Sequence, residues 1–195
     1  MTQTADRLAP YDRYVAHVQA ACRTDPGKRA ALRSGLGRRP EQAYRMHAVV
    51  ARWLDAGAGP AKERAFYTVA SLIAAQPPSA RSEPDEQQGD VGKRTSLGAA
   101  LGLVAKTLPG DRRRIAEGSA ERRLHLLVRQ GVDGIHRQLP VTVRLVRAAG
   151  IPVDWVRLID ELSRWPTDHD RIAKRWLQDF YRTVQPSLGD DNEQE

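Results

Sequence analysis

The chain has 195 residues, a formal net charge of +7 and a pI near 10. This length allows one large domain or two small ones with a buried core, and the positive charge indicates an anionic partner. A single cysteine, Cys22, excludes an internal disulfide framework and favours a reducing compartment. The first ten residues lack the apolar run of a signal peptide, and no stretch has the roughly 20 apolar residues of a membrane span. We therefore expect a soluble cytoplasmic protein with no membrane partner.

The positive charge is concentrated in two segments. Residues 21–53 carry eight Lys or Arg side chains against two acidic ones, and residues 112–147 carry nine against three. Because nucleic-acid affinity depends on local neutralisation of phosphates, this clustering favours nucleic-acid binding more strongly than the net charge does. The candidate phosphate-binding side chains are Lys28, Arg29, Arg33, Arg38 and Arg39 in the first segment, and Arg112, Arg113, Arg114, Arg122, Arg123, Arg129, Arg137, Arg144 and Arg147 in the second.

The N-terminal part is predicted to be helical. Apolar residues at helical spacing predict a first helix at about residues 10–23. Asp25 before Pro26 is typical of an N-cap and a first-turn proline, so a short helix is expected there, closed by Gly35. A helix over residues 41–54 is expected to direct one side inward, formed by Tyr44, His47, Val50, Ala51 and Leu54.

Residues 57–60 break the chain before another predicted helix at residues 61–76. Its inward side chains are expected to be Phe66, Val69, Ala70 and Ile73. Residues 77–94 are rich in proline, glycine and charge, so a mobile surface loop is predicted. This loop separates an N-terminal helical part, residues 1–76, from a C-terminal helical bundle, residues 95–183.

The C-terminal part begins with a helix of small residues that Ser96 caps and that ends near Pro109. Its Gly98 and Gly102 permit close approach of another helix. Further on, Asp154 is predicted to open a helix at residues 155–165, and Thr167 to cap a last helix at residues 168–183. Residues 184–195 are predicted to form a disordered acidic tail.

The central stretch is residues 121–150. Plotted at 100° per residue, it places five arginines opposite an apolar stripe, with Asp133 as the single acid on that face. The arginine guanidinium group stays charged, is planar and can donate two hydrogen bonds to phosphate oxygens at once. This face is therefore interpreted as a phosphate-binding surface. Pro140, preceded by Gly131 and Gly134, predicts that the stretch is two helices meeting at a break. The apolar stripe consists of Leu124, Leu127, Val128, Ile135, Leu139, Val143 and Val146.

Strand signals are essentially missing, so the predicted fold class is all-α. The pair His169-Asp170 could belong to a metal-dependent phosphohydrolase, with His125 or His136 and Asp190 as further ligands. We disfavour this because Asp190 lies in an unanchored tail, and an acid in a first helical turn is common. Zinc spacings, phosphate loops and nucleophile elbows are absent from the sequence. No catalytic residue, metal ligand or cofactor is therefore predicted.

Several segments share their order and spacing with a known family over most of residues 10–183. They are KRAALRSG (28–35) followed by Pro40, SLGAAL (96–101), ERRL (121–124), HRQL (136–139), GIPVDW (150–155), Trp165 and Trp176 to Tyr181. This pattern resembles the CasB family, the small subunit of the type I-E CRISPR surveillance complex Cascade. The resemblance implies two small helical bundles packed together, without catalysis, present as a pair of copies beside other Cascade subunits. It also implies a role in bracing the crRNA–target hybrid and offering a basic path to the displaced DNA strand.

The expected binding is independent of sequence and mainly electrostatic, since base pairing supplies the specificity in RNA-guided recognition. Tyr44 and Trp53 lie only at the edges of the basic segments, so base stacking is expected to be secondary. Two other functions stay open at this point. One is a protein-interaction adaptor whose arginines meet acidic protein surfaces. The other is a helical DNA-binding regulator, although no base-reading recognition helix stands out.

Overall fold

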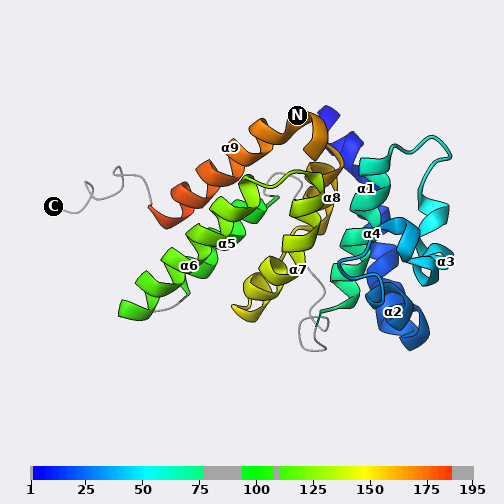
Figure 1. Cartoon of the computed structure of the whole chain (residues 1–195), viewed down its shortest axis with the longest axis horizontal. Helices are drawn as coiled ribbons and strands as arrows, with labels where there is room; N and C mark the ends of the chain where they lie inside the picture. Colours follow the sequence, from blue (N-terminus) through cyan, green and yellow to red (C-terminus); the bar gives the residue numbers. More distant parts are fainter. Residues whose placement is uncertain (1, 77–93, 108–109, 186–195) are drawn as a thin grey trace.

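The computed structural model describes residues 2–76, 94–107 and 110–185, and the side chains of residues 7–76, 94–107 and 118–185. These residues form nine α-helices and three short 3₁₀ helices without any strand (Figure 1), which confirms the predicted all-α class. None of the helices in these ranges combines the length and the apolar character needed to cross a membrane. The predicted mobile loop and acidic tail fall almost entirely outside the described residues.

The N-terminal helices are α1 (Thr2–Thr24), α2 (Pro26–Arg33) and α4 (Pro60–Ala74). Helix α1 begins well before the predicted residue 10 and contains Pro10. The cap of α2 is confirmed, because the Asp25 side chain accepts a 2.9 Å hydrogen bond from the Lys28 amide. The inward face predicted for α4 is also confirmed by the burial of Phe66, Val69, Ala70 and Ile73.

The single helix predicted over residues 41–54 is wrong. The chain instead forms η1 (Pro40–Gln42), η2 (Tyr44–Met46), α3 (His47–Val50) and η3 (Ala51–Trp53). A 3₁₀ helix has three residues per turn rather than 3.6, so the inward face changes along such a segment. Of the predicted inner residues, Val50 is buried and Leu54 half-buried, whereas Tyr44, His47 and Ala51 are exposed.

The short helix ends just before Gly35, as predicted, since α2 ends at Arg33 and Ser34 is its C-cap. The left-handed backbone conformation belongs to Gly37, with φ +74°. Gly35 packs closely on η2, since a Cβ there would lie 2.0 Å from Sδ of Met46 and 3.3 Å from Cβ of Ala43, and the Met46 side chain would have to shift. The turn after α2 therefore lies directly against η2.

The C-terminal helices are α5 (Leu97–Lys106), α6 (Gly110–Val128), α7 (Val132–Ala148), α8 (Trp155–Ser163) and α9 (Trp165–Val184). The caps predicted at Ser96 and Asp154 are confirmed by hydrogen bonds from Ala99 N (3.1 Å) and Arg157 N (2.9 Å). The central stretch is indeed two helices, but they meet at residues 129–131, and Pro140 lies inside α7. All seven residues of the predicted apolar stripe are buried.

The cap predicted at Thr167 is wrong, because its hydroxyl donates to the Arg164 carbonyl at 3.2 Å instead of accepting from a backbone amide. Helix α9 already begins at Trp165 and kinks at Asp168, which has φ −117° and ψ 19°. Trp165 anchors this first turn, since its ring is buried 5.1 Å from that of Trp176. Its Nε1 also donates to the Gln130 carbonyl at 3.0 Å.

The helices form two groups, as Figure 1 shows: α5, α6 and α9 lie together at one end, and α1, α2 and α4 at the other. Helix α8 packs on α1 and α4, and α7 lies between the groups. The predicted close approach in the first group is confirmed. A Cβ on Gly98 would lie 2.0 Å from the Trp176 carbonyl oxygen of α9, and one on Gly102 would lie 2.7 Å from Cβ of Thr183.

Candidate nucleic-acid interface

Helix α7 carries basic side chains along its outer face. Arg137 and Arg144 are exposed, and the opposite face of the helix buries Ile135, Leu139 and Val143. Seven residues correspond to two helical turns, so these two arginines lie about 10 Å apart along the axis. The Arg144 side chain makes no hydrogen bond or ion pair with the described part of the chain. It is therefore available to an external anion.

Asp133, in the first turn of α7, joins the two basic segments. Its carboxylate lies 2.7 Å from the Arg39 guanidinium and also pairs with Arg64 of α4. Arg137 donates to the Asp133 backbone carbonyl at 3.3 Å. The hydrogen bond from Arg64, supported by the charges of Arg39 and Arg137, lowers the pKa of the Asp133 carboxyl. Two guanidinium groups thus pair with the Asp133 carboxylate, and a third bonds to the backbone carbonyl of the same residue.

The remaining predicted residues of the first segment differ in their surroundings. Lys28 forms a 3.5 Å ion pair with Asp25. Arg29 is half-buried and donates to the carbonyls of Ala74 (3.3 Å) and Gln76 (3.5 Å), so it satisfies the C-terminus of α4. Arg33 and Arg38 are exposed, and neither side chain makes a hydrogen bond or ion pair with the residues that the structure describes.

In the second segment, Arg129 is exposed at the break between α6 and α7, without a polar partner among the described residues. Arg122 is also exposed, and its Nε donates to the Gly118 carbonyl at 3.0 Å. Arg123 and Arg147 are half-buried, and they donate to the Gln138 side chain (3.5 Å) and the Ile151 carbonyl (3.3 Å). The side chains of Arg112, Arg113 and Arg114 lie outside the described residues.

Two hollows adjoin the outer face of α7. One, of about 150 Å³, lies between α4 and the C-terminal half of α7 and is bordered by Leu36, Arg144 and Arg147. The other, of about 320 Å³, contains the Arg39–Asp133–Arg64 cluster. Basic side chains from α4, α7 and the turn after α2 therefore meet along one side of the molecule, although the two segments are far apart in sequence.

A different set of arginines neutralises the acids of the interior. Arg94, Arg157 and Arg164 have side chains that are 11%, 17% and 22% exposed, and each makes at least two ion pairs within the chain. Their acidic partners are Asp12 and Asp154 for Arg94, Glu161 and Asp179 for Arg157, and Asp160 and Asp168 for Arg164. Because these acids are paired with Arg94, Arg157 and Arg164, they do not neutralise the exposed arginines of the candidate surface.

Arg45 and Arg64 also belong to this surface, although neither is among the candidate residues predicted from the sequence. Arg45 is exposed on η2, next to the turn that carries Arg38, and Arg64 reaches Asp133 from α4. Arg45 lies within the basic segment 21–53, so its charge alone was a usable signal. Arg64 lies outside both basic segments, and only the packing of α4 against α7 brings it to Asp133.

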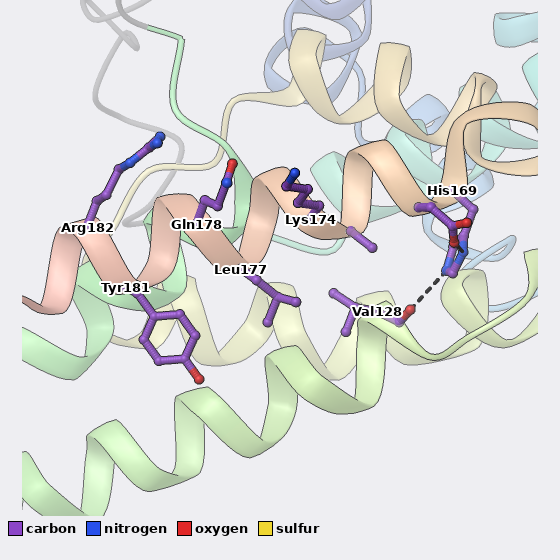
Figure 2. Close-up of a pocket in the computed structure, with 9 residues that line it drawn as sticks. Val128, His169, Lys174, Leu177, Gln178, Tyr181 and Arg182 are labelled. Atoms are coloured by element: carbon purple, nitrogen blue, oxygen red, sulfur yellow. Dashed lines mark hydrogen bonds and ion pairs between the residues drawn. The ribbon is translucent and has the colours of Figure 1, made fainter.

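A separate groove of about 700 Å³ lies between α6 and α9, away from the two hollows beside α7 (Figure 2). Leu177 and Tyr181 point from α9 toward α6, whereas Lys174, Gln178 and Arg182 point away. At its end, His169 lies 2.9 Å from the Val128 carbonyl oxygen and 3.0 Å from the Asp170 carboxylate. Within the described ranges, no three His, Cys, Asp or Glu side chains are arranged to hold a metal ion.

The fold and this surface define an all-helical protein with exposed arginines on α7 and on the turn after α2. A family model described as "CRISPR-associated protein Cse2" matches residues 28–181, and the chain belongs to this family. No curated protein matches it in sequence.

Solved structures agree with this family. One chain of a CRISPR RNA-guided surveillance complex is 38% identical, with coverage of 91% of this chain and 94% of that chain and a TM-score of 0.76. A Cse2-family protein from Thermus thermophilus is 25% identical over 87% of this chain and 96% of its own, with a TM-score of 0.64. A structure of CasB from the same organism, at 24% identity, shares the fold over 87% of this chain and 96% of its own, with a TM-score of 0.63. The resemblance to CasB is confirmed.

Proposed function

We propose that this chain is a non-catalytic subunit of a CRISPR RNA-guided surveillance complex of the Cascade type. Its partners are crRNA, target and non-target DNA, other Cascade subunits and a second copy of itself. Membership of the Cse2 family supports the assembly, and the related chain belongs to such a complex. The observation that carries nucleic-acid binding is the exposure of Arg33, Arg38, Arg129 and Arg144 without polar partners in the described part of the chain.

The proposed mechanism is electrostatic. Lys and Arg side chains replace the counterions of the sugar-phosphate backbone, and release of those ions favours binding. Arginines about 10 Å apart on a rigid helix contact several phosphates without reading bases, which suits a complex whose guide RNA supplies the specificity. By holding the displaced DNA strand and bracing the crRNA–target hybrid, this surface disfavours reannealing of the two DNA strands. The proposal assigns no catalytic step and no cofactor to the chain.

The test is binding of the full chain to a single-stranded DNA oligonucleotide of about 20 nucleotides at several salt concentrations. The logarithm of the affinity should fall with the logarithm of salt by about 0.7 per contacted phosphate. Replacing Arg137→Glu together with Arg144→Glu should weaken binding and reduce this slope by roughly 1.4. The control, Arg171→Glu with Lys174→Glu on α9, makes the same change in net charge at exposed positions that belong to neither basic segment. An affinity that does not change with salt concentration would contradict the proposal. So would an equal loss of DNA affinity in the two double variants.

A second candidate is an adaptor that uses the same arginines to bind acidic protein surfaces. The Asp133 cluster favours it, since Arg39 and Arg64 already bind a carboxylate there. The Arg137→Glu, Arg144→Glu double variant distinguishes the two candidates within the assembled complex. Loss of DNA retention by an intact complex supports the nucleic-acid function, whereas failure to assemble supports the adaptor.

A further inference from the structure

Tyr44 is exposed in an unusual way. Its relative exposure of 76% exceeds that of every other large hydrophobic side chain among the described residues, the next being Val141 at 50%. The backbone around Tyr44 is nevertheless fixed by packing. Ala43, directly before it, is 2% exposed, and Met46, two residues later, is fully buried. The ring is therefore presented to solvent from a fixed base. An aromatic face held in this way loses little conformational freedom when a flat partner stacks on it.

The ring is also supported on one side. His47, one turn further along, lies edge-on to Tyr44 with 6.5 Å between ring centroids. The Nδ1 atom of His47 is itself hydrogen-bonded to the hydroxyl of Tyr67 on α4, a residue only 2% exposed. This contact ties the imidazole to the core, and no other aromatic ring among the described residues contacts Tyr44.

Three arginines lie on the segments next to this ring. Because Gly35 packs on Ala43 and Met46, the turn after α2 brings Arg33 and Arg38 next to η2. Arg45 directly follows Tyr44. The side chains of these three arginines are exposed and make no hydrogen bond or ion pair with the residues that the structure describes, and Glu41 nearby is an exposed acid. An aromatic ring among unpaired cations has the composition of a site for single-stranded nucleic acid, where bases stack and phosphates are held by charge.

We infer that Tyr44 stacks on an unpaired base of a bound single strand while Arg38 and Arg45 hold the adjoining phosphates. This inference rests on the proposed nucleic-acid function and adds a contact to the base, where that function requires only the backbone. A base inside a duplex keeps both faces covered by its neighbours, so the Tyr44 site favours single strands over duplexes. It is also insensitive to sequence, since every base has a π-face.

The experiment compares full-length wild type, Tyr44→Ala and Tyr44→Phe in binding to an oligothymidine of about 20 nucleotides, to an oligouridine of the same length and to a matched DNA duplex. Tyr44→Ala should weaken single-strand binding by roughly 5- to 150-fold. It should leave duplex affinity and the salt slope unchanged, because no charge is removed. Tyr44→Phe should bind as wild type. A difference between the thymidine and uridine arms identifies whether DNA or RNA supplies the base.

Tyr181→Ala is the matched control, because Tyr181 is also exposed (37%) but lies beside Glu121 at the other end of the molecule. Thermal unfolding should be unchanged in Tyr44→Ala, since the ring is outside the core. If Tyr44→Ala binds single strands as wild type does, or loses duplex binding equally, the inference is overturned. The proposed function still stands if the Arg137→Glu, Arg144→Glu variant loses binding. If the wild type binds no nucleic acid in any arm, the inference and the proposed function both fail.

Discussion

Arg39 and Asp133, which are 94 positions apart in the sequence, form an ion pair with 2.7 Å between Nη2 and Oδ2. Both side chains are about half exposed, at 57% and 50%. The pair links the turn region before η1 to the first turn of α7, and Arg64 of α4 completes it. A carboxylate at this position competes with any phosphate for the same guanidinium groups.

Replacing Asp133→Asn should therefore tighten binding to single-stranded DNA by about 2- to 5-fold at low salt, since one repulsive charge is removed. Because the arginines lower the pKa of Asp133, its ionised form stabilises the fold above the unfolded-state pKa, and this contribution is lost as the pH falls through the folded-state value. The variant should thus be slightly less stable than wild type at pH 7 and equal to it in acid. Weaker DNA binding by the variant would show instead that Asp133 positions the arginines.

The close packing of α5 on α9 should make Gly98 intolerant of a side chain. In Gly98→Ala the new Cβ would lie 2.0 Å from the Trp176 carbonyl oxygen, a backbone atom that cannot move without the helix. Separation of the two helices should cost about 3 kcal/mol in the free energy of unfolding, measured by chemical denaturation. Gly118→Ala in α6 is the control, because a Cβ there has no neighbour within 4 Å. It should stabilise the protein by about 0.5–1 kcal/mol; equal losses would contradict the packing argument.

His136 should make the protein less stable in mild acid. It is 4% exposed, its Nδ1 lies 2.8 Å from the Thr68 hydroxyl, and burial, with the charge of Arg64 adding to it, lowers its pKa to about 3. The unfolded chain takes up a proton near pH 6.5, so the stability falls as the pH drops from there towards 3. Between pH 8 and pH 5 this amounts to about 2 kcal/mol.

Denaturant unfolding at the two pH values measures this effect. Between pH 8 and pH 5, the free energy of unfolding of His136→Leu should fall by about 2 kcal/mol less than that of wild type. A His136 variant that loses as much stability in acid as wild type would contradict a neutral buried imidazole.

Arg157 should be essential for stability, because it is the partner of a buried acid. Glu161 is 1% exposed, and its carboxylate oxygens lie 2.9 Å from Nε of Arg157 and 2.7 Å from Nε1 of Trp176. Burial raises the pKa of Glu161, and Arg157 opposes that rise. Arg157→Met should reduce the free energy of unfolding at pH 7 by about 3–5 kcal/mol, since it leaves a buried charge unpaired.

Some of that stability should return as the pH is lowered toward the unfolded-state pKa, because protonated Glu161 needs no cationic partner. Arg171→Met removes an exposed arginine that pairs with Asp168 at 3.6 Å. It should change the stability by at most about 1 kcal/mol. Similar effects of the two substitutions would mean that the Arg157 network contributes no more than a surface ion pair.

The helical class, most helix positions and the apolar stripe of α6 and α7 could be predicted because burial imposes a period of 3.6 residues on a packed helix. Local caps were equally visible: Asp25, Ser96 and Asp154 each accept a hydrogen bond from an amide three residues later. Residues 40–53 could not be predicted, because the 3₁₀ segments there follow a different period.

The sequence by itself determined where positive charge accumulates and which side of each long helix is apolar, because both depend on residue type and short-range spacing. Tertiary structure decided which arginines are exposed, which satisfy a helix end as Arg29 does, and which pair with buried acids as Arg157 does. It also placed Tyr44 in solvent among cations and brought Arg39 and Arg64 to Asp133. The partners of a long charged side chain are set by the packing of distant helices, and local periodicity contains no information about that packing.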